Sequence, residues 1–211
     1  MKAFKKTWLI SNALFVLNYS LYLSLFIVRL PIPNLPSIFN IIFLLLSYST
    51  SLLKMINKIS TIPAQPNFYC ILVFLTFPSP ILLLPFYFLS LYHLISFVLS
   101  HKVEFEHSGI YRLCVVLSSW HVALGRMALV CKIVGVPLSL ILFVFGSGSI
   151  GTFLTYIWMV RQEYQNIPAM RSVFGEVRCR MDEAVGMLPE NVQYFYLKTK
   201  ELIMHYQQVM K

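Results

Sequence analysis

The stretch FYCILVFLTFPSPILLLPFYFLSLYHLISFVLS, residues 68–100, runs for 33 residues without a Lys, Arg, Asp or Glu. As one straight helix it would be about 50 Å long, whereas the hydrocarbon core of a bilayer is about 30 Å thick. Pro78, Pro80 and Pro85 interrupt it, and each removes a backbone donor and disfavours helix in the residue before it. The stretch therefore predicts two shorter helices folded into a hairpin inside a membrane, with one kinked span as the alternative.

The composition of the whole chain agrees with a membrane protein. Apolar residues make up 58% of it and charged residues 12%, whereas soluble domains carry about 25% charge. The formal net charge of +9 fits basic ends that flank apolar spans and face anionic cytosolic lipid. A nucleic-acid partner is not expected, because no soluble segment carries a basic stripe with interleaved aromatic residues. The four scattered cysteines form no CxxC pair, which argues against a zinc site or a disulfide framework.

Three further apolar runs complete a predicted all-helical, polytopic membrane domain over residues 1–160. These runs are residues 7–30, 37–53 and 127–160. The three lysines before residue 7 predict that the first transmembrane helix starts in the cytosol. The proline-rich segment PIPNLP then turns the chain, and Lys54 and Lys58 after the second run indicate a return to the cytosolic side.

The run at residues 127–160 is interrupted by Lys132 and by the GSGS of residues 146–149. We expect this GSGS to form the bend of a second hairpin, with arms near residues 133–145 and 150–160 that are too short to cross fully. A single broken helix is the alternative. Lys132 lies near the start of the run, where its long side chain is expected to reach the interface. The chain thus crosses four or six times, and either count puts both termini on one side, predicted to be cytosolic.

The segment between these runs, residues 101–126, mixes charged and apolar residues, and its second half predicts either an interfacial helix or a buried soluble helix. Its HKVEFEH stretch contains His101, Glu104, Glu106 and His107 in a spacing unlike the known zinc motifs, so no metal is expected. His93 in the central stretch is expected to be a hydrogen-bonded packing residue. With no catalytic motif and few ionisable groups inside the membrane, we expect no enzyme activity, cofactor or small-molecule substrate.

From Arg161 the chain becomes charged, and residues 161–211 predict a cytosolic tail of two amphipathic helices. Insertion of the apolar face into a leaflet, where such helices sense or support curvature, is one interpretation. Packing of the two helices on each other or on residues 101–126 is the other. The predicted membrane-binding face consists of Phe174, Val177, Met181, Val185, Leu188, Val192, Phe195, Tyr196, Leu202, Ile203 and Tyr206.

Three stretches carry a family resemblance: PFYFLSLYHLISFVLSHK at residues 85–102, FGSGS at residues 145–149 and PAMRSVFGEVR at residues 168–178. The third is the most specific, a pattern of P-x-x-R-S/T-aliphatic-F-x-E-aliphatic-R directly after the last membrane segment. In these stretches the chain resembles the transmembrane protein 33 family, which includes the fungal pore-membrane nucleoporin and its relatives that shape the endoplasmic reticulum. The signature residues are Pro168, Arg171, Phe174, Glu176 and Arg178.

The resemblance implies a non-catalytic protein of the endoplasmic reticulum membrane and nuclear envelope. It implies reticulon-type membrane-shaping proteins and nucleoporins as partners, beside the lipid bilayer itself. The combined hypothesis is a protein that shapes or stabilises curved membrane, contributing to nuclear pore complex assembly or distribution and to the organisation of tubules. The alternatives are a membrane-anchored adaptor whose tail recruits a soluble partner, and a small transporter or lipid-handling enzyme.

Overall fold

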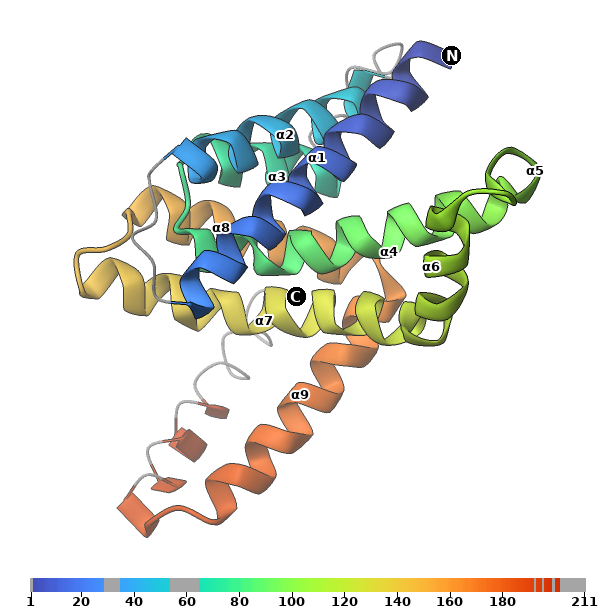
Figure 1. The fold of residues 1–211 in the computed structure, drawn as a ribbon. Coiled ribbons are helices and arrows are strands. Elements are labelled where there is room, and N and C mark those ends of the chain that lie inside the picture. Colours follow the sequence, from blue (N-terminus) through green and yellow to red (C-terminus); the bar gives the residue numbers. More distant parts are fainter. Residues whose placement is uncertain are drawn as a thin grey trace. The chain divides into compact units, whose positions relative to one another are not determined.

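The computed structural model describes residues 2–28, 35–53, 65–191, 193–194, 196–198 and 200–201, and every regular element among them is a helix (Figure 1). The predicted all-α class is thereby confirmed. The chain divides into two compact units, Met1–Met170 and Arg171–Lys211. In the described residues, three helical stretches are long and apolar enough to cross a membrane, namely Phe4–Ile27, Pro80–Ser100 and Gly109–Val144.

The first two helices form the predicted pair. Helix α1 (Lys2–Ile27) and helix α2 (Leu35–Leu53) pack side by side. They run antiparallel, because Asn12 bonds to Ser47 whereas Asn18, further along α1, bonds to Asn40, earlier in α2. The predicted turn between them, with Arg29, and the basic residues Lys54 and Lys58 lie outside the described residues.

The central stretch is broken at its prolines, as predicted. Helix α3 (Pro66–Leu75) ends before Pro78, and the chain resumes as a short 3₁₀ turn, η2 (Pro80–Leu83), and helix α4 (Leu84–Ser100). At the break Phe77 has a φ of 50°, a left-handed conformation that bulky residues rarely adopt. Figure 1 shows that the chain reverses direction here. The 10 residues of α3 cover about 15 Å, half of the hydrocarbon thickness.

The segment after α4 contains α5 (Lys102–Phe105), α6 (Gly109–Leu117) and a 3₁₀ turn, η3 (Ser118–Trp120). Ser108 caps α6 by accepting a hydrogen bond from the backbone of Tyr111. Cys114 packs against Ile95 and Val98 of α4. Other apolar residues of α6, including Ile110 and Val116, are exposed. Helix α6 thus has one packed side and one exposed apolar side, and both interpretations of this segment stay predictions.

Helix α7 (His121–Val144) starts before the expected arm and continues through Pro137. The prediction that both arms are too short to cross is wrong for α7, since its 24 residues cover about 36 Å. Apolar periodicity alone placed the start too late, because the mixed segment before residue 127 is helical as well. Helix α8 (Ile150–Asn166) likewise runs past residue 161, where the composition changes.

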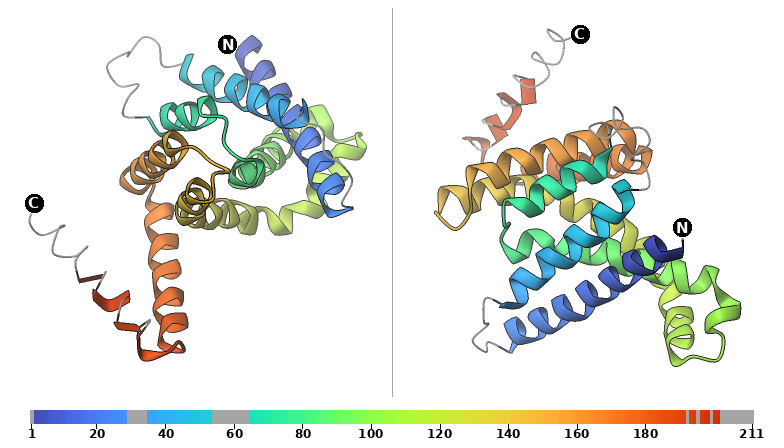
Figure 2. Two further views of the ribbon diagram at one scale, coloured as in Figure 1. Left: turned by 90° about the vertical axis from the view of Figure 1, so that its left-hand side faces the viewer. Right: turned by 90° about the horizontal axis from the view of Figure 1, so that it is seen from above.

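The GSGS stretch forms the predicted bend between α7 and α8. Gly146 adopts a φ of 73°, and its amide and that of Ser147 bond to the carbonyls of Phe143 and Leu142, the pattern of a Schellman helix end. Ser149 then caps α8 by accepting from the amide of Thr152 at 3.0 Å. The predicted second hairpin is thus confirmed, and Figure 2 shows α3 lying beside α8.

Lys132 does not reach the interface, and that prediction is wrong. Its side chain is 3% exposed, and its Nζ donates to Oε1 of Glu163, also 3% exposed, at 2.5 Å. The Nζ also lies 5.4 Å from the centre of the Phe86 ring on α4. The sequence places Glu163 in the predicted cytosolic tail, whereas α8 extends to Asn166 and buries Glu163 in the bundle. The partner of Lys132 was therefore not expected. A buried lysine is retained where an opposite charge meets it.

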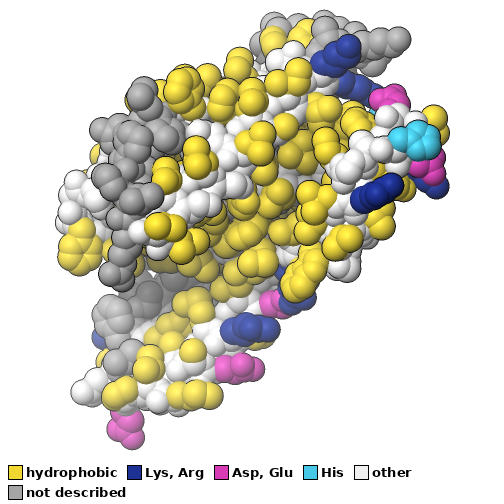
Figure 3. Space-filling view, viewed as in Figure 1, with side chains coloured by type: hydrophobic (Ala, Val, Ile, Leu, Met, Phe, Trp, Pro, Cys, Tyr) yellow, Lys and Arg dark blue, Asp and Glu magenta, His cyan; other side chains and the backbone are white. Residues whose placement is uncertain are grey.

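Apolar side chains cover most of the surface of unit Met1–Met170 on the face in Figure 3, while charges gather near α5 and the start of α1. Exposed examples on α1 include Leu17, Leu21 and Phe26. A monomeric soluble domain rarely exposes so large an apolar area. Lipid contact accounts for it, in agreement with the candidate spans.

We expect that Glu163→Leu lowers the free energy of unfolding by about 3–5 kcal/mol, because it leaves the Lys132 charge buried without a partner. Lys132→Met combined with Glu163→Leu should restore most of this loss. Thermal unfolding of the purified protein in detergent measures both. The control is Glu106→Gln, which opens the exposed pair with Lys102 and should cost less than about 1 kcal/mol. Equal effects of the Glu163 and Glu106 changes would contradict the role of the buried pair.

The close approach of α7 to α8 provides a second stability test. A Cβ on Gly135 would clash with the ring and hydroxyl of Tyr156, whereas a Cβ on Gly151 would make ordinary contacts. Gly135→Ala should therefore destabilise the protein by about 1–3 kcal/mol, and Gly151→Ala should not destabilise it. The same thermal measurement checks this, and a Gly135→Ala protein as stable as the unmodified one would refute the tight crossing.

Candidate functional site

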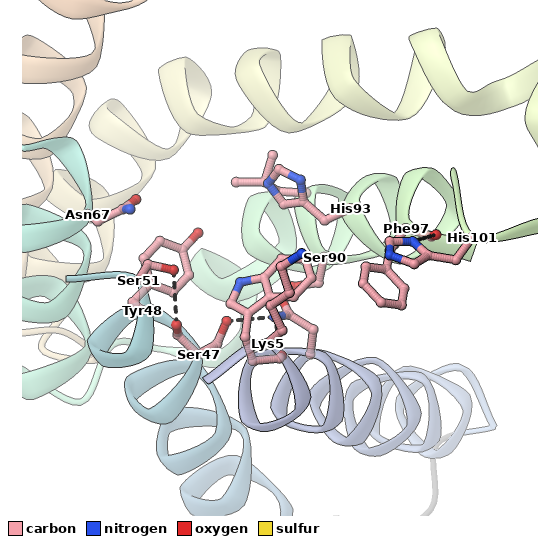
Figure 4. Close-up of a pocket in the computed structure, with 12 residues that line it drawn as sticks. Lys5, Ser47, Tyr48, Ser51, Asn67, Ser90, His93, Phe97 and His101 are labelled. Atoms are coloured by element: carbon pink, nitrogen blue, oxygen red, sulfur yellow. Dashed lines mark hydrogen bonds between the residues drawn. The ribbon is translucent and has the colours of Figure 1, made fainter. Parts of the chain in front are cut away.

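A cavity of about 410 Å³ lies among helices α1 to α4 (Figure 4). It opens where α1 begins, α2 ends, α3 begins and α4 ends. Its volume falls within the usual range of small-ligand sites, about 300–1,000 Å³. The lining residues are Lys5, Trp8, Asn12, Ser47, Tyr48, Ser51, Asn67, Leu89, Ser90, His93, Phe97 and His101.

Three polar side chains from three helices form a hydrogen-bonded network in this cavity. The Nδ2 of Asn12 donates to Oγ of Ser47 at 2.6 Å, and Oγ of Ser90 donates to Oδ1 of Asn12 at 2.9 Å. All three residues are buried. The network therefore ties α1 to both α2 and α4, as hydrogen-bonded polar residues do between helices in lipid.

Aromatic residues pack against the basic side chains of the cavity. The Trp8 ring lies 5.9 Å from that of His93 and 6.4 Å from that of Phe97. The His101 ring stacks on Phe97 at 4.2 Å, and its Nδ1 lies 2.9 Å from the carbonyl of Phe97. Since a carbonyl only accepts, this contact places a hydrogen on Nδ1 and leaves Nε2 of His101 for another partner.

His93 is predicted to be a hydrogen-bonded packing residue, and the structure shows the packing but not the hydrogen bond. Its ring makes edge contacts with Trp8 and Tyr92. Among the residues that the structure describes, its nitrogens have no hydrogen-bond partner. In the same residues no group of three or more His, Cys, Asp or Glu side chains is placed to hold a metal ion.

The signature residues lie at the start of helix α9 (Pro168–Gly186). Pro168 is its first residue, where a missing amide hydrogen costs nothing. Arg171, Phe174 and Arg178 are exposed, whereas Glu176 is half-buried.

The unit Arg171–Lys211 contains a helix pair held by one carboxylate. Asp182 of α9 accepts from the Tyr196 hydroxyl at 2.6 Å and from Lys200 at 2.9 Å. Residues 190–191, 193–194, 196–198 and 200–201 are helical, and Gln193 donates to the carbonyls of Gly186 and Leu188. Hydrogen bonds from Lys200 and Tyr196 hold the pKa of Asp182 below its ordinary value.

The members of the predicted membrane-binding face occupy different environments in this unit. Phe174, Met181 and Leu188 are 41%, 51% and 45% exposed. Val177, Val185 and Tyr196 are half-buried. The face therefore divides into exposed and half-buried residues, and both interpretations of the tail stay predictions. Val192, Phe195, Leu202, Ile203 and Tyr206 lie outside the described residues.

Sequence reasoning missed Glu163, the Asn12 network and the Asp182 contacts. A signal existed for Glu163, because a lysine inside an apolar run calls for a search of the nearby helix ends for an acid. For Asn12 and Asp182 no spacing rule applies, since their partners lie far away in the sequence.

A family model described as Transmembrane protein 33/Nucleoporin POM33 matches residues 64–208, more than half of the chain. The three stretches that carried the resemblance all lie within the matched residues. The match starts directly before α3, so α1 and α2 lie outside it. No curated protein and no solved structure matches the chain.

We expect that Asp182→Asn speeds amide hydrogen exchange in residues 190–201 of the full-length protein, because it weakens the contacts to Lys200 and Tyr196. Since the folded pKa of Asp182 is depressed, this difference from the unmodified protein is fully present above the ordinary value of 3.8. It disappears as the pH falls through the depressed value. Exchange mass spectrometry at several pH values measures it.

The matched control for this experiment is Glu183→Gln, which neutralises the adjacent exposed carboxylate. It should leave the exchange unchanged at every pH. Equal exchange in the Asp182→Asn and unmodified proteins at neutral pH would show that Asp182 does not hold the helix pair.

Proposed function

We propose, from the premise that the chain belongs to the Transmembrane protein 33/Nucleoporin POM33 family, that it shapes or stabilises curved membrane in the endoplasmic reticulum and nuclear envelope. The family name joins a transmembrane protein and a nucleoporin, and the chain is an all-helical membrane protein with three candidate spans. The proposal assigns it no catalysis. It includes a contribution to nuclear pore assembly or distribution and to tubule organisation, with reticulon-type proteins and nucleoporins as partners.

The observation that carries the proposal is the unequal length of the membrane helices. Helix α3 covers about half of the hydrocarbon thickness, whereas α1 and α7 cover it fully. A helix that ends halfway adds cross-section mainly to one leaflet. Such an asymmetric, wedge-like cross-section favours a curved bilayer over a flat one.

The exposed stripe of α9 supports the same proposal. Phe174, Met181 and Leu188 follow helical spacing, and their exposed apolar area gains from insertion between lipid headgroups. Residues 161–211 contain seven basic and six acidic residues, so attraction to anionic lipid is weak. Burial of apolar area must then supply most of the binding free energy.

A second function, the membrane-anchored adaptor, is favoured by the contacts of Asp182. They hold the helix pair together through side chains of the chain itself, and a preformed apolar stripe of this kind also suits a protein partner. The liposome experiment below separates the two functions. A transporter or lipid-handling enzyme is a weaker candidate, because the buried Lys132 and Glu163 neutralise each other.

We expect the purified full-length protein to narrow liposomes into tubules or small vesicles when reconstituted. Replacement of Phe174, Met181 and Leu188 by Ser should increase the vesicle diameter at equal protein density, because the stripe no longer inserts. Electron microscopy measures the diameters. The control is Val103→Ser, which removes an apolar side chain that is 93% exposed on α5.

Liposomes of unchanged diameter with the unmodified protein would overturn the shaping proposal. If the unmodified protein narrows liposomes and the triple variant narrows them equally, the membrane helices shape the bilayer and the stripe of α9 serves a partner instead.

A further inference from the structure

The cavity among α1 to α4 has an unbalanced charge. Lys5, His93 and His101 line it, and none of its lining residues among those described is Asp or Glu. Three lysines elsewhere in the described structure meet acids, namely Lys102 with Glu106, Lys132 with Glu163 and Lys200 with Asp182. A site with several basic groups and no acid is complementary to an anion.

Several hydrogen-bond donors of the cavity have no partner in the described parts of the chain. They are Nζ of Lys5, the ring N–H of His93 and the side-chain amide of Asn67. By contrast, the side chain of Asn12 is hydrogen-bonded to those of Ser47 and Ser90. The free donors therefore differ from the structural ones, and they come from three helices, α1, α3 and α4 (Figure 4).

The position of the cavity suits a lipid headgroup. It lies at an end of the bundle, where α1 begins with its lysines and where Trp8 takes the place typical of an aromatic residue at a membrane interface. Trp8, Tyr48 and Phe97 provide apolar walls beside the basic groups. Such a combination binds a charged group at one end and apolar matter at the other.

We propose that this cavity binds a phosphate-bearing anion, the headgroup of an anionic phospholipid, with Lys5 and His93 as the principal contacts. The Lys5 ammonium supplies the compact charge that phosphate oxygens attract, and a ring N–H of His93 donates a second hydrogen bond to the anion. Asn67 and His101 lie at opposite sides of the cavity (Figure 4), so neither is assigned to the same anion. The inference does not rest on curvature shaping, because it concerns binding to a different part of the molecule from the stripe of α9.

Trp8 provides the readout, because it is one of three tryptophans in the chain and lines the cavity. Trp120→Phe and Trp158→Phe in the full-length protein leave Trp8 as the single fluorophore. In nanodiscs of phosphatidylcholine, we expect dioctanoyl phosphatidic acid to change its fluorescence in a saturable way. Dioctanoyl phosphatidylcholine is the lipid control, and inorganic phosphate is the soluble probe.

Lys5→Gln and His93→Gln should each weaken the apparent affinity for phosphatidic acid by about tenfold or more, the usual cost of one charged hydrogen bond. The matched control is Lys102→Gln, an exposed lysine paired with Glu106 outside the cavity lining, which should leave the affinity unchanged. Lys5 is itself exposed at the start of α1, so its replacement tests binding without disturbing the core.

Binding of phosphatidic acid alone would support a lipid site. Binding of both phosphatidic acid and inorganic phosphate, with the same sensitivity to Lys5→Gln, would support a phosphate site open to soluble anions. Absence of saturable binding, or binding that both cavity variants leave unchanged, would overturn the proposal. None of these outcomes depends on liposome diameter, so failure here is distinct from failure of the shaping function.

Discussion

The ion pair between Lys132 and Glu163 is the constraint around which the helical bundle is built. A lone lysine in the middle of an apolar bundle is costly, and the cost falls only if an acid from another helix reaches it. Helix α8 has to fold back against α7 to bring Glu163 there, and the small Gly135 lets Tyr156 come close enough. The Schellman end at Gly146 and the cap at Ser149 set the direction of that return.

Neutral hydrogen bonds fix helices α1, α2 and α4 against one another, as the ion pair fixes α7 against α8. In lipid, helices gain little from burying apolar surface against each other, so packing and polar contacts specify their neighbours. Asn12 contacts both Ser47 and Ser90, and thereby fixes α1 against α2 and α4. The cavity lies beside this network. Since Asn12, Ser47 and Ser90 bond to one another, they do not use the other donors of the cavity.

The two proposals assign different tasks to different parts of the chain. The short α3 and the apolar stripe of α9 concern the shape of the bilayer, whereas the basic cavity concerns the chemistry of the lipid. Together they describe a protein that could respond to both the curvature and the charge of the membrane around it. The family to which the chain belongs, Transmembrane protein 33/Nucleoporin POM33, fits a membrane task for both parts.

Local chemistry predicts the break at Pro78 and Pro80, the bend at residues 146–149 and the presence of the membrane helices, although not the start of α7 or the end of α8. Each depends on backbone donors and conformations within a few residues. Only the tertiary structure shows the burial of Lys132, the hydrogen bonds of Asn12 and the contacts of Asp182. Their partners come from distant helices, and periodicity shows which residues share a helix face but not which helix that face meets. An apolar run therefore predicts a membrane helix. Whether a charged side chain inside that run is buried depends on whether the folded chain places an opposite charge next to it.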